Sequence, residues 1–192
     1  EVGGRGSSSG LSNGSGISTV ERKICHDEVE SAYLFDTDGN VIFSKSDNTK
    51  NYVTFSEEQV KQFEDNILTH NHPGGSTFSC EDVSLLTYSK MQEIRATTSK
   101  GTFSLRANKD SKSYEKGSLA FSEDYSYSIY LRTKHCDGVY EKLLKDYRNF
   151  RIDEVEFQKG CDALNSGMAE FRNTWLEENS HKYGYIYRFQ GR

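Results

Sequence analysis

Two histidines separated by one residue, His70 and His72, have the clearest capacity for chemistry in this sequence. They follow an apolar run at 66–69 that predicts a strand, and side chains two residues apart along an extended segment point the same way. Two imidazoles at the end of a buried strand can bind one cation, and Asp82 follows ten residues after His72 as a candidate third ligand. Zinc takes such ligands in a tetrahedral array, and a catalytic site leaves the fourth position for water.

The segment between the second histidine and Asp82 carries the signals that fold the chain back. Pro73-Gly74-Gly75 predicts a sharp turn, and Ser79 predicts the start of a helix. The Ser79-x-x-Asp82 spacing is also that of an ordinary helix cap, in which the acid suits the helix dipole. The sequence therefore leaves two interpretations of Asp82 open, metal ligand and capping residue.

The run of residues 69–73, Thr-His-Asn-His-Pro, followed by Ser79 and Asp82, resembles the signature of the JAMM (JAB/MPN) metallopeptidases, especially the RadC-like branch. The resemblance covers roughly residues 28 to 106. It implies a JAMM/cytidine-deaminase-like core and a Zn²⁺ ion held by His70, His72 and Asp82. It also implies that Ser79 hydrogen-bonds the oxyanion that develops on the substrate.

The same family requires an upstream glutamate, at the start of a strand, as the general base. Glu30 immediately precedes the predicted strand 31–35 and is assigned that role, with Glu28 as the reserve. The substrate that the resemblance implies is a protein or peptide, cleaved at an amide or isopeptide bond. An ordinary surface charge is the alternative interpretation of Glu30, because it lies in an acidic stretch.

One departure from the family pattern affects the third ligand. The loop after His72 is one residue shorter than the family usually has, so Cys80 occupies the usual position of the serine. A thiolate is itself a zinc ligand, and Cys80 could replace or supplement Asp82. If the family spacing is strict, the roles assigned to Ser79 and Asp82 weaken together.

A second resemblance extends over a longer part of the chain. The Gly/Ser-rich start, the Asp36-x-Asp38-Gly39 hairpin, the T-H-N-H-P motif and the strand at 93–96 are similar to C-terminal domains of phage minor head (head-morphogenesis) proteins. That similarity implies phage head proteins as partners and a location in the bacterial cytoplasm or the virion.

The remaining patterns predict an α/β (α+β) protein with a mixed sheet, flanking helices and a helical C-terminal extension. Residues 1–19 are predicted to be a flexible Gly/Ser linker, 20–107 the metal-binding core, and 108–192 a mainly helical extension packed on or beside that core. Further strands are expected at 52–55 and 185–189, and a helix from Ser56 to about residue 65.

Composition narrows the function classes. The net charge of −5 and scattered cations argue against a nucleic-acid binder, and no apolar run is long enough to span a bilayer. The four cysteines form no C-x-x-C pair and are interpreted as free thiols, and nothing indicates secretion. The sequence thus predicts a zinc-dependent hydrolase. The alternative is a non-catalytic phage head-associated or interaction module with a structural metal or none.

Overall fold

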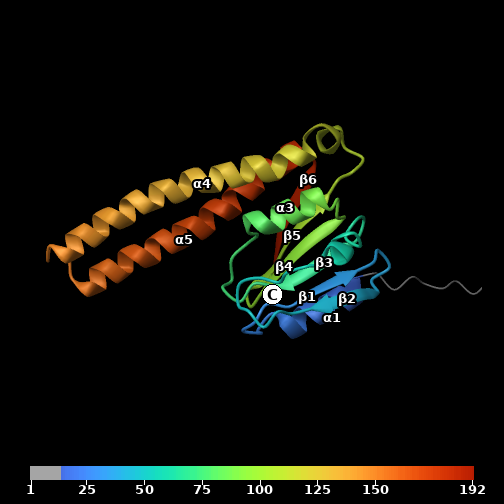
Figure 1. The fold of residues 1–192 in the computed structure, drawn as a ribbon, viewed down its shortest axis with the longest axis horizontal. Coiled ribbons are helices and arrows are strands. Elements are labelled where there is room, and N and C mark those ends of the chain that lie inside the picture. Colours follow the sequence, from blue (N-terminus) through green and yellow to red (C-terminus); the bar gives the residue numbers. More distant parts are fainter. Residues whose placement is uncertain (1–13) are drawn as a thin grey trace, which may run out of the picture.

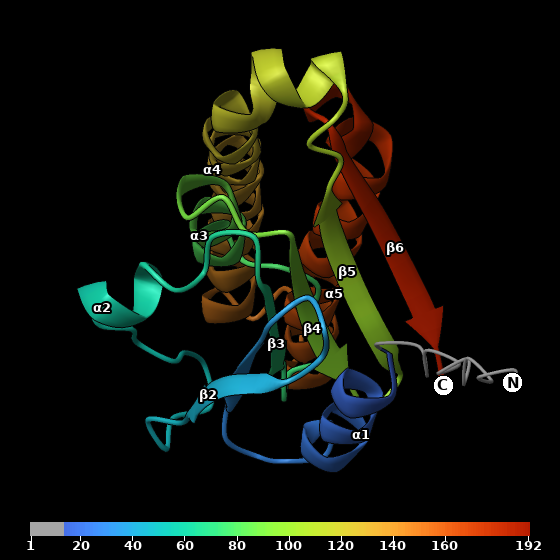
Figure 2. The same cartoon turned by 90° about the vertical axis from the view of Figure 1, so that its right-hand side faces the viewer.

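A six-stranded mixed sheet organises the chain in the computed structural model, which describes residues 14–192 (Figures 1 and 2). In chain order the strands are β1 (Ala32–Phe35), β2 (Val41–Lys45), β3 (Ile67–Asn71), β4 (Glu93–Thr98), β5 (Gly101–Ala107) and β6 (Tyr185–Gly191). They lie in the order β2-β1-β3-β4-β5-β6, and only the central β3–β4 pair is parallel. The predicted mixed sheet with flanking helices is confirmed.

Helices cover both faces of this sheet (Figure 2). They are α1 (Gly14–Ile24), α2 (Glu57–Val60), α3 (Cys80–Tyr88), α4 (Lys112–Arg148), α5 (Glu154–Asn179) and the 3₁₀-helix η1 (Ser180–Tyr183). The crossover between the parallel strands β3 and β4 runs through α3, which packs with α4 over one face, whereas α1 lies on the other face beside β3. Because side chains alternate along β3, its residues are divided between these two environments.

The main core lies between the sheet and the helices α3, α4 and α5. Alternate strand residues such as Leu68 and Ile94 meet Leu86 of α3 and the rings of Phe121 and Tyr125 of α4, all fully or almost fully buried. Aromatic side chains fill much of this space, since the Trp175 ring lies 6.1 Å from the Phe121 ring and 5.0 Å from the Tyr125 ring. The generous aromatic content thus offsets the scarcity of aliphatic residues.

The first helix begins nearer to the N-terminus than the sequence pattern indicates. Residues 14–19, predicted as linker, form the first half of α1, in which Ile17 is buried. The prediction is wrong for this stretch because small residues here permit close packing: a Cβ on Gly16 would lie 3.0 Å from the Gly39 carbonyl oxygen. Residues 1–13 of the predicted linker lie outside the described part of the chain.

The segment 52–65 is less regular than predicted. Residues 52–55 form no strand, and the helix that Ser56 caps ends at Val60 rather than near residue 65. The predicted capping box of Ser56 and Gln59 is present. The segment is held instead by aromatic packing, because the Phe55 and Phe63 rings lie 5.0 Å apart in an edge-on contact.

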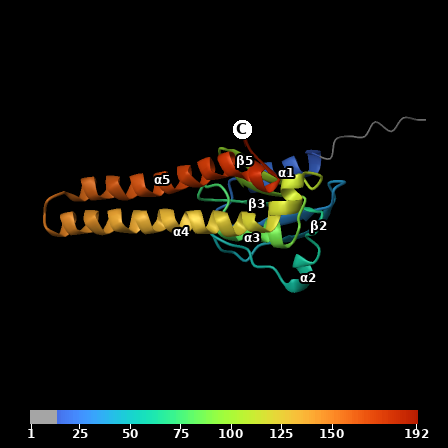
Figure 3. The same cartoon turned by 90° about the horizontal axis from the view of Figure 1, so that it is seen from above.

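Residues 108–192 are not an appendage. The predicted last strand is β6, which pairs along its whole length with β5 and extends the sheet that carries β3. The helices α4 and α5 contribute buried side chains to the same core as the strands. Their outer halves project beyond the sheet as an antiparallel hairpin (Figure 3). No described helix combines the length and the apolar character needed to cross a membrane.

A buried ion pair fastens α1 to the sheet. The guanidinium of Arg95 on β4 donates to both carboxylate oxygens of Glu21 at 2.6 and 3.2 Å, and Thr69 of β3 donates to the same carboxylate at 3.0 Å. Glu21 is only 5 % exposed. Without the Glu21 carboxylate, Arg95 would keep one ion pair, with Glu93 at 2.7 Å, and would lose the two-fold contact that offsets its burial.

We therefore expect Glu21→Gln to lower the free energy of unfolding by about 3 kcal/mol, measured by urea denaturation. Glu28→Gln is the matched control, because the ion pair of Glu28 with Lys50 is solvent-exposed and spans 3.9 Å. Equal stability of the two variants would contradict this role of Glu21.

Candidate metal centre

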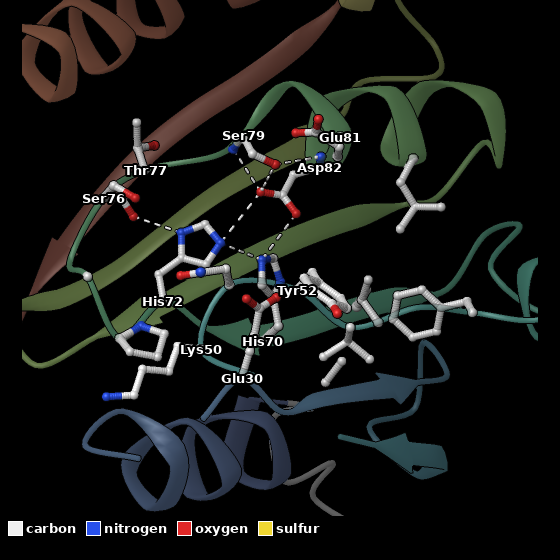
Figure 4. A pocket seen from close by; sticks show the side chains of 18 of the residues that line it. Glu30, Lys50, Tyr52, His70, His72, Ser76, Thr77, Ser79, Glu81 and Asp82 are labelled. Carbon is white, nitrogen blue, oxygen red and sulfur yellow. Dashed lines mark hydrogen bonds and ion pairs between the residues drawn. The ribbon is translucent and has the colours of Figure 1, made fainter. Parts of the chain in front are cut away.

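The end of β3 presents two imidazoles to one point above the α3 face of the sheet (Figure 4). His70 is the fourth residue of the strand, and His72 follows it directly in extended continuation, with its backbone N–H bonded to the Thr97 carbonyl at 2.8 Å. The Nε2 atoms of the two histidines lie 2.8 Å apart. The two side chains therefore point the same way, as predicted.

Asp82 completes this arrangement from the first turn of α3. Its Oδ1 lies 3.2 Å from Nε2 of His70, and its Oδ2 lies 3.5 Å from Nε2 of His72. A tetrahedral zinc ion with bonds of about 2.1 Å separates its ligand atoms by about 3.4 Å. The two oxygen–nitrogen distances, 3.2 and 3.5 Å, lie close to that value, whereas the nitrogen–nitrogen distance of 2.8 Å is clearly shorter.

Capping and metal ligation are not exclusive roles for Asp82. Its Oδ2 accepts hydrogen bonds from the backbone N–H and the hydroxyl of Ser79, at 2.7 and 2.8 Å, in a capping box at the start of α3. Its Oδ1 remains directed at His70. The cap therefore orients the carboxylate, and the facing imidazoles hold its pKa well below the usual value despite burial, which acts in the opposite direction.

Glu30 approaches the histidines from the other side. One carboxylate oxygen of Glu30 and one ring nitrogen of each histidine lie within 4.8 Å of one another. At this spacing the three groups could hold a metal ion. Glu30 is 7 % exposed, and burial raises the pKa of its carboxyl group above the ordinary value of 4.5, although the two imidazoles oppose that shift. Glu28, the reserve candidate, is highly exposed and pairs with Lys50 instead.

Asn71, between the two histidines, holds Glu30 in place. Its side chain points to the opposite face of the sheet, where it donates to the carbonyls of Asp27 and Val29 at 3.2 and 3.0 Å and accepts from the Ser31 N–H at 2.7 Å. These bonds bracket Glu30 on both sides. No role of Asn71 was predicted from the sequence, although a polar residue that alternates with two inward-facing histidines on a buried strand is itself a signal.

The two imidazoles differ in how their other nitrogen is bonded. Nδ1 of His72 donates to the Ser76 carbonyl at 2.9 Å, which leaves Nε2 free to accept a cation. Asp82 and this carbonyl raise the pKa of His72 above 6.5, although burial opposes them as the largest single effect. Nδ1 of His70 is buried and has no hydrogen-bond partner among residues 14–192.

The loop of residues 73–79 is fixed by side chains from the C-terminal region. Tyr125 of α4 donates its hydroxyl to the Phe78 carbonyl at 2.8 Å. The hydroxyl of Tyr187 on β6 lies 2.7 Å from that of Thr77 and also donates to Asn173 of α5 at 2.7 Å. The loop between the second histidine and the third candidate ligand is therefore attached directly to α4 and β6, and through Tyr187 to α5.

The remaining sequence candidates have different positions. Neither the Cys80 thiol nor Asp82 belongs to the group of Glu30, His70 and His72 whose ligand atoms lie within 4.8 Å of one another. Asp82 nevertheless lies 3.2 Å from His70, whereas no contact of the Cys80 thiol with either histidine is found, and burial raises the pKa of that thiol, which disfavours the thiolate a metal would need. The proposed substitution of Cys80 for Asp82 as ligand is therefore unsupported. Ser79 is adjacent to the centre, but its hydroxyl already donates to Asp82 and accepts from the Asp82 N–H. Its assignment to the oxyanion stays a prediction.

The candidate centre lies in a pocket of about 530 Å³, a size suited to a substrate side chain or a short peptide segment. One wall is formed by the segment 50–55 and the loop that begins at Pro73. Glu81 of α3, which is labelled in Figure 4, and Arg172 of α5 also line the pocket. The projecting helical hairpin therefore contributes to the pocket at its base.

No family model, curated protein or solved structure matches this chain. The geometry of its own residues is therefore what indicates a metal centre in this chain. The resemblance to JAMM metallopeptidases, which the motif spacing indicates, stays a prediction.

We expect purified protein to bind about one zinc ion per chain and the His72→Ala variant to bind none, because the variant loses one of three converging ligands. Elemental analysis after dialysis against a limited zinc concentration measures this. His135→Ala is the matched control, since His135 lies exposed on α4 away from the pocket. Zinc retained equally by both variants would contradict the assignment.

The metal-free protein should be less stable at alkaline than at mildly acidic pH. The pKa of His72 in the folded protein is raised above 6.5, so protonation of His72 stabilises the fold. This stabilisation is complete below pH 6.5 and is lost as the pH rises through the pKa of the folded state. The lowered pKa of Asp82 contributes above pH 3.8 and is lost only as the pH falls through its folded value. Urea denaturation with a chelator, at pH about 5.5 and about 8.5, should therefore show a larger loss in wild type than in His72→Gln.

Proposed function

We propose that this protein is a zinc-dependent hydrolase that cleaves amide or isopeptide bonds, with a JAMM-like catalytic centre. The observation that carries the proposal is the convergence of two imidazole nitrogens and the Asp82 carboxylate on one point. The carboxyl group of Glu30, whose pKa is raised, lies beside them in the same pocket. His70, His72 and Asp82 would hold the ion. Zn²⁺ bound there lowers the pKa of a coordinated water molecule towards about 7 and polarises a substrate carbonyl.

In this proposal Glu30 moves the proton. Its carboxylate accepts a proton as the water oxygen attacks the amide carbon, and it returns that proton to the amine nitrogen as the carbon–nitrogen bond breaks. The raised pKa of Glu30 suits both steps, because a base with a pKa nearer the working pH accepts and releases a proton more effectively. The Asn71 hydrogen bonds support this role by holding the segment that carries Glu30.

Asp82 and Ser79 orient the centre in the same scheme. The Ser79 hydroxyl donates a hydrogen bond to Asp82, and it would have to turn towards the substrate to contact an oxyanion. We therefore assign Ser79 first to positioning Asp82, and only second to oxyanion stabilisation. Phage head proteins remain the partner context that the sequence similarity implies, and this too is a proposal.

Glu30→Gln should retain zinc but lose at least about 100-fold in the rate of peptide hydrolysis, because glutamine cannot accept the proton. The measurement is a screen of fluorogenic and ubiquitin-like isopeptide substrates with zinc-loaded protein. Glu28→Gln is the control, since that exposed carboxylate lies outside the metal-ligating group.

Two results would contradict the enzyme proposal. One is a Glu30→Gln variant as active as wild type, which would assign any hydrolysis to another group. The other is a zinc-loaded wild type that cleaves no substrate in the screen, which would favour the non-catalytic head-associated or interaction module.

A further inference from the structure

Arg172 is an uncompensated cation in the wall of the candidate active-site pocket. It lies on α5, is half-buried, and lines the same pocket as the two histidines and Glu30. Its Nε atom is buried without a hydrogen-bond partner. No described residue accepts a hydrogen bond from its guanidinium or forms an ion pair with it. The buried Nε–H donor therefore lacks a hydrogen bond, which is costly, and the two terminal nitrogens of the guanidinium have no protein acceptor among the described residues.

The backbone that carries Arg172 is firmly held. Its neighbour Asn173 accepts a hydrogen bond from Tyr187, whose hydroxyl also contacts Thr77 of the loop of residues 73–79. On the other side Phe171 packs against the core. These contacts hold the base of the Arg172 side chain at a constant place relative to the candidate ligands, a requirement for recognising one group of a substrate.

Arg172 forms no direct ion pair with the charged groups that line the described pocket. The carboxylates of Asp82 and Glu30 would offset the two positive charges of a bound zinc ion. At the rim, Lys50 interacts with Glu28 outside the pocket. Glu81 also lines the pocket, but it is exposed and forms no ion pair with Arg172. An anion on the substrate is therefore the partner that this arrangement lacks.

We propose that Arg172 binds a carboxylate of the substrate, so that the protein acts on peptides or amides with a free carboxylate close to the scissile bond. This inference rests on the proposed function. The planar guanidinium matches a carboxylate in two parallel hydrogen bonds, and such charge-assisted pairs are about twice as strong as neutral ones. Arg172 is thus a specificity-determining residue, contributed by the helical hairpin rather than by the motif segment.

Binding of small metal-chelating probes tests this without a known substrate. The protein is loaded with Co²⁺, whose visible spectrum reports the ligand sphere, and titrated with an alkyl hydroxamate. Hydroxamates of the same series that end in a carboxylate one, two or three methylenes away are compared with it. We expect one of these lengths to bind wild type about tenfold more tightly or better, and the gain to disappear in Arg172→Gln.

Two matched variants separate Arg172 from other cations. Arg132→Gln removes a guanidinium from α4 that lies over the Phe171 ring, at 5.6 Å from its centroid, and outside the pocket. Lys50→Gln removes the second cation of the pocket. Both should keep the gain. Arg172→Gln should also unfold at the same urea concentration as wild type or a higher one, because it deletes an unpaired cation.

The outcomes are distinct. Failure to take up Co²⁺ would overturn the proposed function and this inference with it. Uptake of Co²⁺ with no gain from any carboxylate, or with a gain that survives Arg172→Gln, would overturn the role of Arg172 alone. A phosphonate of the best length that binds more tightly than the carboxylate would also overturn the carboxylate assignment and identify a phosphate-like group instead.

Discussion

The candidate site depends on the hydrogen bonds of one amide side chain, that of Asn71. Strand β3 directs His70 and His72 towards α3, so Asn71 between them must face the other way, beneath the segment that leads into β1. Its three bonds pair with two carbonyls and one N–H of the partly buried segment 27–31. The same contact therefore sets the position of the strand end and of the carboxylate that faces it. An apolar residue at this position would leave three backbone groups unpaired.

Asp82 and the loop that leads to it are held in place by other contacts. Asp82 is oriented by its own helix cap, which is local, but the loop that leads to it is held by tyrosines that lie far away in the sequence. The ligands are thus supported from both faces of the sheet: by the Asn71 contact on the side of α1, and by α4, α5 and β6 on the side of α3. Such support is needed because four ionisable groups are gathered where water cannot screen them.

Local chemistry explains which parts of this structure the sequence predicted. Strands β1 to β5, the cap of α3 and the alternation of the histidines follow from periodicity and turn residues, and each prediction needs only neighbouring positions. The start of α1 and the irregular stretch at 52–55 were mispredicted, because packing against Gly39 and among phenylalanines outweighed composition and β propensity. Asn71 and Arg172 were missed for a related reason, since their roles depend on residues 40 positions away or more.

The attachment of the loop of residues 73–79 to β6 affects the order in which parts of the protein fold during synthesis. The contact between Thr77 and Tyr187 spans 110 residues, and the Arg192 side chain reaches the Glu21 carbonyl across 171. Local elements can form as soon as they leave the ribosome, whereas these long-range closures await the last strand. The loop that joins the histidines to the third ligand therefore becomes fully anchored only after both long helices have been made. A chain interrupted before residue 185 would keep the complete histidine motif and Asp82 but lack the anchor that Tyr187 provides.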